Sequence, residues 1–242
     1  MSINSLASVQ SIILKKKTPA GLPPVIATIT NTQAPAPFQP GFYLTVSTSV
    51  KNSSNNQISE CTCIVSNQTS PYTFMNGTYY FLTSSTTSTA IGSNLQLTFY
   101  GDSVPDAWLG PPNYNSSGTY TGSVSTNVGG SSITGEWIQI RLPYRLYITT
   151  YSINANINGG SSWNYMFPKS YYLCGSTDGT NWSVVDNRSG LTCNSNGLNS
   201  FTAPTQTQGY SYFRLIGQQI GVGSGQGFRM CVCVGLRGTY RG

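Results

Sequence analysis

The chain has 242 residues, of which 12% are aromatic and 7% charged, and it contains no histidine. Its net charge of +6 comes without the dense basic stripe that is typical of nucleic-acid-binding proteins. The lack of histidine removes the commonest general base and metal ligand, and no two acidic residues form a recognisable catalytic motif. We therefore expect neither an enzyme nor a nucleic-acid-binding protein.

Residues 1–40 are predicted to form an extended arm. They hold six of the 13 prolines, which exclude long helices and central strands. No segment of the chain approaches the roughly 20 apolar residues of a transmembrane helix. The basic run at 15–17 follows a short apolar patch, the reverse of a secretory signal peptide. Five apolar residues of the arm are expected to dock on another surface: Leu14, Val25, Ile26, Ile29 and Phe38.

From residue 41 to 242, alternating apolar and polar runs separated by turn residues predict an all-β fold, a jelly-roll β-sandwich. Long connections are predicted at 101–134, 155–169 and 190–208, where binding residues usually lie on such a scaffold. The predicted strands span residues 41–50, 61–66, 77–85, 94–100, 136–142, 146–153, 170–176, 182–186, 209–220 and 228–236.

Four of the six cysteines form two Cys-x-Cys pairs, Cys61 with Cys63 and Cys231 with Cys233. Residues i and i+2 of a strand share one face, so each pair presents two sulfurs to one side. The alternatives are buried free thiols, disulfides between the two strands, and a metal site, although zinc sites usually use Cys-x₂-Cys spacing.

The segment LCGSTDGTNWSVVD (173–186) carries a strong hairpin signal. Asp178 and Gly179 lie between two β-rich runs, and both residue types tolerate the positive φ of a tight turn. Trp182 follows the turn at once. We predict that Trp182 is largely buried, together with Trp137, Tyr212 and Leu215.

Three phrases occur in the order GEWIQIRLP (135–143), YLCGSTDGTNWSVVD (172–186) and YSYFRLIG (210–217). In that order they resemble the discoidin family, the coagulation-factor type C domains of galactose-binding-like fold. The resemblance covers roughly residues 76–238. It implies a jelly roll whose core is closed in part by Trp182, with the turn held by Ser176 and Asp178. It also implies that the strand of Cys61 lies beside the strand of Cys231.

Other stretches resemble a branch of this family that is rich in Ser, Thr and Asn and common in large DNA viruses of eukaryotes. They are MNGTYYFLTSS (75–85), YNSSGTYTGSVST (114–126) and SWNYMFPKSYYLCGS (162–176). With the low charge and the arm, this favours a structural virion protein: a minor capsid component, assembled in the host cytoplasm, that contacts major and minor capsid proteins. The alternative is a carbohydrate-binding, lectin-like attachment module with glycans as partners.

The connection at 155–169 contains candidate contact residues for a glycan or for a neighbouring subunit: Trp163, Tyr165, Phe167 and Lys169. Carbohydrate sites combine an aromatic platform with a few planar polar groups, and these side chains could supply both.

The family's first long loop usually reads Phe-Asp-Gly and helps to form a calcium site. Here Tyr100 stands in the place of that Asp, which leaves Asp102 and Asp106 as candidate metal ligands. Because calcium takes six to eight oxygen ligands, two carboxylates are a poor set, and we expect no cofactor.

Overall fold

The computed structural model describes residues 26–28, 49–53, 57–65, 77–85, 99, 108–155, 165–194, 197–221 and 230–241. Nearly all of the regular structure in them is β-strand, and no helix among them is long and apolar enough to cross a membrane. The strands are β1 (Ile26–Thr28), β2 (Ser49–Ser53), β3 (Gln57–Val65), β4 (Gly77–Thr83), β5 (Trp108–Leu109), β6 (Ser125–Val128), β7 (Ser131–Thr134), β8 (Glu136–Asn154), β9 (Pro168–Ser176), β10 (Ser183–Arg188), β11 (Leu198–Thr202), β12 (Tyr210–Ile220) and β13 (Cys231–Arg241).

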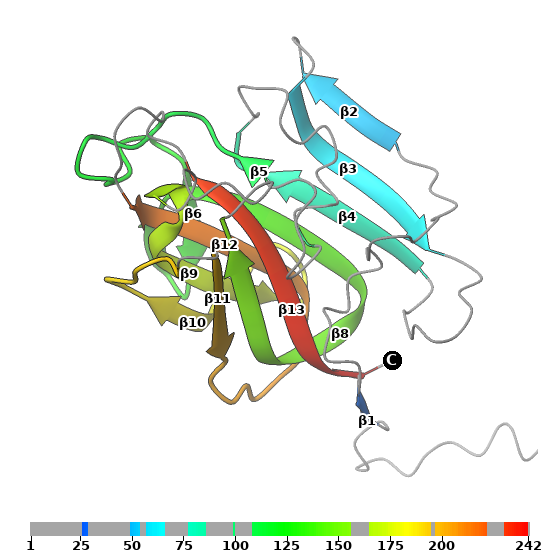
Figure 1. The fold of residues 1–242 in the computed structure, drawn as a ribbon. Helices are drawn as coiled ribbons and strands as arrows, with labels where there is room; N and C mark the ends of the chain where they lie inside the picture. The colour runs from blue at the N-terminus through cyan, green and yellow to red at the C-terminus, as the bar shows by residue number, and fades with distance from the viewer. Residues whose placement is uncertain are drawn as a thin grey trace, which may run out of the picture.

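The strands form an antiparallel β-sandwich whose two layers share strand β8 (Figure 1). One layer has the order β10-β9-β12-β8-β4-β3-β2, in which the first half of β8 pairs with β12 and β4. The second half of β8 pairs with β11 and β13, and β13 also pairs with β1 and β5. The predicted all-β sandwich is confirmed.

Strand β8 joins two segments that the sequence predicts as separate strands, 136–142 and 146–153. Pro143 lies where the pairing partners of β8 change: Arg141 still pairs with Tyr80 of β4, whereas Arg145 already pairs with β13. A proline cannot donate a hydrogen bond to a neighbouring strand. The strand tolerates Pro143 because it lies where β8 changes from one set of partner strands to the other. The prediction of a break there is wrong.

The main core lies between the two layers and takes alternate residues of each strand. Ile138, Ile140 and Leu142 of β8 point into it, as do Leu173 of β9 and Leu215 of β12. The alternating pattern of these strands is thus the direct cause of the sandwich.

A second, smaller hydrophobic cluster lies on the other face of the β9-β12-β8 layer. It contains Trp182, Cys174 and Ile216, covered by Val128 of the β6-β7 hairpin. Trp182 is buried, with 5% of its surface exposed, so its predicted burial is confirmed. The resemblance, however, implies a role in closing the jelly-roll core, and here Trp182 lies on the opposite face of the layer.

Arg214 holds this second cluster together. Its guanidinium lies 3.8 Å from the ring centre of Trp137 and 4.3 Å from that of Trp182. It donates to Gln139 Oε1 and to Thr126 Oγ1. Burial lowers the pKa of Arg214 to about 10. Trp137 is half-buried in this arrangement, less than the sequence predicts, because its ring packs at the edge of the cluster. Tyr212 packs against the same cluster and is also half-buried, less than the sequence predicts. Leu215 is buried as predicted.

Several strands lie where the sequence predicts only connections or the arm. The β6-β7 hairpin falls in the connection 101–134, and β11 falls in 190–208. Their short runs are rich in Ser, Thr and Asn and carry weak β signals. Within the predicted arm, Ile26–Thr28 forms β1 and pairs with β13 of the body. The division of the chain at residue 40 stays a prediction.

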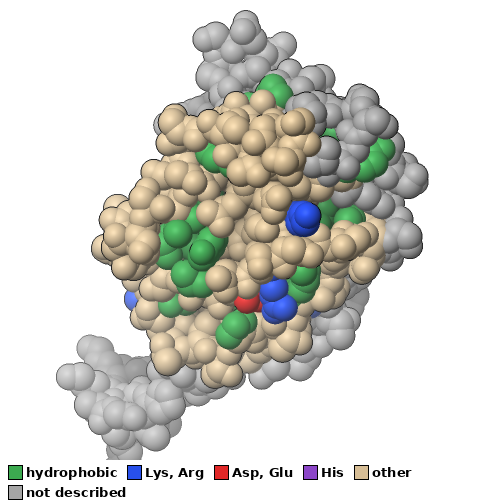
Figure 2. All heavy atoms as spheres, turned by 90° about the vertical axis from the view of Figure 1, so that its left-hand side faces the viewer, with side chains coloured by type: hydrophobic (Ala, Val, Ile, Leu, Met, Phe, Trp, Pro, Cys, Tyr) green, Lys and Arg blue, Asp and Glu red, His purple; other side chains and the backbone are tan. Residues whose placement is uncertain are grey.

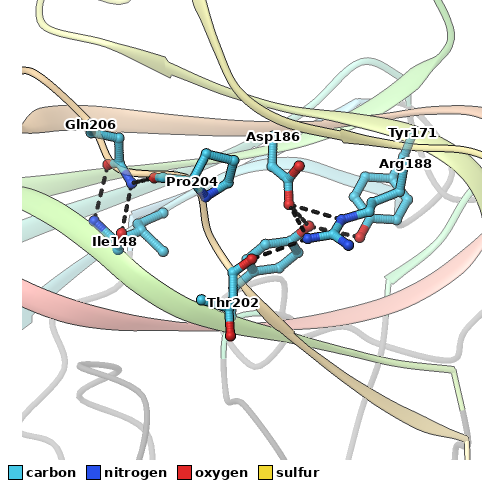
Figure 3. Close-up of polar contacts among 8 residues, drawn as sticks. Ile148, Tyr171, Asp186, Arg188, Thr202, Pro204 and Gln206 are labelled. Carbon is cyan, nitrogen blue, oxygen red and sulfur yellow. Dashed lines mark hydrogen bonds and ion pairs between the residues drawn. The ribbon is translucent and has the colours of Figure 1, made fainter.

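A buried polar network ties the second layer to β9 and β10 (Figure 3). The Tyr151 hydroxyl is 2.8 Å from that of Tyr171 and donates to Asp186 Oδ2 at 2.7 Å. Arg188 forms an ion pair with Asp186 at 2.8 Å and donates to the Thr202 carbonyl. Burial raises the pKa of Tyr151 well above its ordinary value. The network compensates the burial of the Asp186 carboxylate with a cation and a hydroxyl.

Beyond the end of β11, a side chain continues the pairing with β8. Gln206 accepts from the amide of Ile148 at 3.0 Å and donates to its carbonyl at 2.6 Å (Figure 3). The amide group thus replaces one residue of a β-strand, so that the backbone of Ile148 is satisfied where β11 has ended.

Glu136, at the start of β8, is fully buried and is held by neutral groups. Ser84 and Ser85 donate their hydroxyls to Oε2, while Asn113 donates to Oε1 at 2.7 Å and Tyr120 at 3.2 Å. Burial, followed by the charge of Glu136, raises the pKa of Tyr120 to about 12. These contacts fix the loop before β6 onto the sheet.

Candidate functional site

A pocket with a volume of about 310 Å³ opens where three connections of the sandwich meet. It lies at the start of β9, at the end of β12, and beside the segment that follows β10. Seven of the residues that the structure describes line it: Tyr165, Phe167, Lys169, Leu191, Thr192, Cys193 and Gly221. Tyr165, Phe167 and Lys169 are among the contact residues that the sequence predicts.

Backbone hydrogen bonds fix the three connections relative to one another. The amide of Leu191 donates to the Lys169 carbonyl at 3.0 Å, and the amide of Gly221 donates to the Phe167 carbonyl at 3.1 Å. A Cβ on Gly221 would lie 2.8 Å from the carbonyl oxygen of Tyr165. Glycine is therefore required for this close approach, and the shape of the pocket is set by the backbone.

The aromatic side chains of the pocket differ in exposure. Phe167 is 1% exposed and belongs to the main core, so it forms the base of the pocket. Tyr165 is half-buried and keeps part of its side chain accessible. The tyrosine is the side chain available for stacking against a ligand.

Two polar side chains of the pocket, Lys169 and Tyr165, are not used by the fold. The side chain of Lys169 forms no ion pair or hydrogen bond with any residue the structure describes, and the same holds for the hydroxyl of Tyr165. Thr192 is exposed. Lys169, Tyr165 and Thr192 therefore contribute an ammonium and two hydroxyl groups to the described lining, which contains no carboxylate.

Cys193 is the one thiol of the lining. It is half-buried, and its Sγ lies 3.6 Å from the carbonyl oxygen of Gly197, to which it donates. Burial raises the pKa of Cys193 to about 11. At neutral pH it is a protonated, weakly nucleophilic thiol.

The other candidates from the sequence have different outcomes. Trp163, Asp102 and Asp106 lie outside the described residues. Within the described ranges no group of three or more His, Cys, Asp or Glu side chains could hold a metal ion. The metal site at Asp102 and Asp106 stays a prediction.

The two Cys-x-Cys strands are not neighbours. Strand β3, with Cys61 and Cys63, lies between β2 and β4, whereas β13, with Cys231 and Cys233, pairs with β1, β5 and β8. The expectation that these strands run side by side is wrong, because β8 places β13 in the other layer. Cys231 is a buried thiol whose Sγ lies 3.8 Å from the carbonyl oxygen of Ala155, to which it donates.

The hairpin 176–182 at the far end of β9 contrasts with the pocket, because the Ser176 hydroxyl and the Asp178 carboxylate are used within the hairpin. Asp178 accepts from Ser176 and from the amides of Thr180 and Asn181. Ser176 accepts from the amide of Gly179, which has a φ of 80°. Hydrogen bonds from Asn181 and Thr180 hold the pKa of Asp178 well below its usual range. The predicted structural role of this motif fits these contacts.

Four lining residues are not predicted from the sequence: Leu191, Thr192, Cys193 and Gly221. Leu191, Thr192 and Cys193 lie in the predicted long connection 190–208, and Gly221 directly follows the predicted strand 209–220. Their residue types give no further signal, because the contact between the connections depends on strand order.

Parts of the chain are similar to solved carbohydrate-binding modules. A family 32 module from a family 31 glycoside hydrolase of Clostridium perfringens is 15% identical, with 59% of this chain and 81% of that chain covered and a TM-score of 0.42. A second C. perfringens module, solved with GalNAc-β-1,3-galactose, is 13% identical over 66% of this chain and 94% of that chain, with a TM-score of 0.42.

A fragment of a putative chitobiase from Bacteroides thetaiotaomicron is 11% identical over 58% of this chain and 73% of that chain, with a TM-score of 0.41. No protein-family model matches the chain, and no relative was found among curated proteins. Similarity of this extent transfers neither a ligand nor an activity. The capsid role, the viral origin and the virion location stay predictions from the sequence.

Proposed function

We propose that the domain is a non-catalytic carbohydrate-binding module whose binding site is the pocket at the start of β9. The observation that carries this proposal is the convergence of an accessible aromatic ring, an ammonium and a hydroxyl in one concave site: Tyr165, Lys169 and Thr192. None of these three groups forms a hydrogen bond or ion pair with another residue that the structure describes. They are available to a ligand.

The chemistry of the lining matches a sugar ring. The apolar face of a pyranose stacks on an aromatic ring, and its hydroxyls form hydrogen bonds with a few polar groups at the edge. In the pocket, the ring would be supplied by Tyr165 and the hydrogen bonds by Lys169 and Thr192. The volume of about 310 Å³ is at the small end of ligand sites and suits one or two sugar residues.

The pocket also supports binding without catalysis. Glycoside hydrolysis generally needs two carboxyl groups that flank the scissile bond, and the lining residues that the structure describes include none. Cys193 is protonated at neutral pH because its pKa is raised to about 11, which makes it a poor nucleophile. We therefore assign recognition rather than turnover to this site.

The capsid role that the sequence favours has no observation among the described residues to carry it. The short strand β1 pairs with β13 of the same chain, which gives part of the predicted arm an intramolecular partner. A glycan-binding module can also be part of a virus particle. The capsid role and the carbohydrate-binding role therefore differ in one respect: only the second requires the pocket to bind a ligand.

The test is a screen of the purified chain against an array of neutral and acidic glycans, followed by titration calorimetry with the best ligand. We expect Tyr165→Ala to weaken binding by roughly tenfold or more, the loss of about 1.4 kcal/mol of stacking. Lys169→Ala should weaken it to a similar extent. Val184→Ala is the matched control, because Val184 is 48% exposed and does not line the pocket. Unchanged affinity in Tyr165→Ala and Lys169→Ala would refute this site.

A further inference from the structure

A second group of accessible aromatic and cationic side chains lies on the outer face of the β9-β12-β8-β4 layer. Tyr212, Arg141 and Tyr80 are direct cross-strand partners on β12, β8 and β4. Their sequence neighbours Phe213, Ile140 and Phe81 point into the main core. Because successive residues of a strand face opposite sides, the three form one row on the outside of the sandwich.

Arg141 lies between the two tyrosines. Its guanidinium carbon is 4.9 Å from the ring centre of Tyr80 and 5.4 Å from that of Tyr212. The side chain is exposed and makes no ion pair or hydrogen bond with a described residue. The guanidinium thus lies over both tyrosine rings, on a side chain that remains exposed.

The position of Tyr212 is itself fixed. A Cβ on Gly179 would lie 2.9 Å from the ring of Tyr212, so this ring packs directly against the hairpin at 176–182. On its other side Tyr212 contacts Arg141. The arginine is therefore preorganised, and a ligand that binds its N–H edges loses little side-chain entropy.

We propose that this row, Tyr80–Arg141–Tyr212, is an anion site that binds the carboxylate or sulfate groups of an acidic polysaccharide. The planar guanidinium matches such groups with two parallel hydrogen bonds. No acidic side chain among the described residues pairs with Arg141, and the net charge of the chain is +6. The site is independent of the pocket at the start of β9, which is lined by other residues.

The described surface favours a glycan over an apolar protein partner. Among the described residues the one large hydrophobic side chain that is strongly exposed is Val184. On the side of the molecule shown in Figure 2, hydrophobic side chains form small separate patches within a mainly polar surface. A protein interface would need a larger apolar centre. An acidic polysaccharide is rich in hydroxyl groups and carries its charges at intervals, so isolated cations on a polar surface suit it better.

The test is affinity electrophoresis of the full chain in gels that contain polygalacturonate or heparin, with neutral galactan and poly-L-glutamate as comparison polymers. The chain should be retarded by one or both acidic polysaccharides and much less by poly-L-glutamate. Arg141→Ala should weaken this binding by roughly tenfold, as expected for the loss of a charge-assisted contact. Arg141→Lys should restore only part of it, since an ammonium lacks the planar fork.

The matched control is Arg145→Ala, because Arg145 is also exposed on β8 and carries the same charge outside the row. An equal loss in Arg145→Ala would overturn the proposal in favour of general charge attraction. Equal retardation by poly-L-glutamate, unchanged binding in Arg141→Ala, or no binding of either acidic polysaccharide would also overturn it. Tyr165→Ala should keep this binding, so a failure of the pocket and a failure of this site give different results.

Discussion

The two ends of strand β9 differ in how their polar side chains are used. At the end of the strand, Asp178 accepts four hydrogen bonds from the hairpin that contains it. At the start, the side chains of Lys169 and Tyr165 form no hydrogen bond or ion pair with a described residue, and both residues line a pocket. One end uses its polar groups to fold the chain, whereas the other contributes them to the pocket that we propose as a glycan site. A motif that stands out in the sequence can therefore be structural, while the proposed binding site is built from less distinctive residues.

The largest expected effect is on the folded end. Trp182→Ala should reduce the free energy of unfolding by about 3–5 kcal/mol, as for other large-to-small changes in a core. The reason is the loss of contacts with Val128, Ile216 and Arg214 on the outer face of the layer. Urea unfolding measures the change, and Val184→Ala on the neighbouring strand should change it by less than about 0.5 kcal/mol. If Trp182→Ala lowered the free energy of unfolding as little as the control does, the stabilising role of Trp182 in the second cluster would be contradicted.

A smaller loss is expected for Gly179→Ala. Gly179 has a φ of 80°, and an added Cβ would meet the Tyr212 ring at 2.9 Å. The left-handed backbone alone costs about 1–2 kcal/mol for a residue with a Cβ. Thermal unfolding should therefore show a clear decrease in Tm, whereas Gly190→Ala, at a positive φ with open space around it, should lose only the backbone part. Equal losses in both variants would mean that the Tyr212 contact adds nothing.

The hairpin also predicts a pH dependence. Hydrogen bonds from Asn181 and Thr180 hold the pKa of Asp178 below its usual range. A carboxyl group with a depressed folded-state pKa contributes stability above its ordinary pKa, and this contribution is lost as the pH falls through the folded-state pKa. The difference in stability between the wild type and Asp178→Asn should be constant near neutral pH and shrink under acidic conditions. A difference that grows as the pH falls would contradict these contacts.

At the open end of β9, Cys193 reports on occupancy of the pocket. Its pKa of about 11 predicts slow alkylation by iodoacetamide at pH 8 and an increase of about tenfold per pH unit towards pH 10. Peptide mapping by mass spectrometry can follow Cys193 separately from the other cysteines. A saturating glycan should slow its alkylation, and alkylation that is independent of the glycan would count against the pocket.

The sequence predicts the fold better than the site because strand patterns are local and pockets are not. The alternation in 136–142, 170–176 and 209–220 is enough to predict β8, β9 and β12, since one face of each strand is buried. The pocket instead needs Gly221 beside Tyr165 and Leu191 beside Lys169, contacts that depend on strand order. Because strand order cannot be read from local patterns, the expectation that β3 lies beside β13 is also wrong. Pro143 shows that a proline, which predicts the end of a strand, can lie inside one where the partner strands change.

The central claim is that a glycan binds where Tyr165, Lys169 and Thr192 converge, and its most direct test is NMR titration of the ¹⁵N-labelled chain. With the neutral glycan that binds best in the array, the largest amide shift changes should fall on Lys169, Leu191, Thr192 and Gly221 and saturate with a single dissociation constant. The amides of the Ser176–Asn181 hairpin should stay unchanged. Saturable changes at the hairpin or on the outer face, with none at the pocket, would contradict the account.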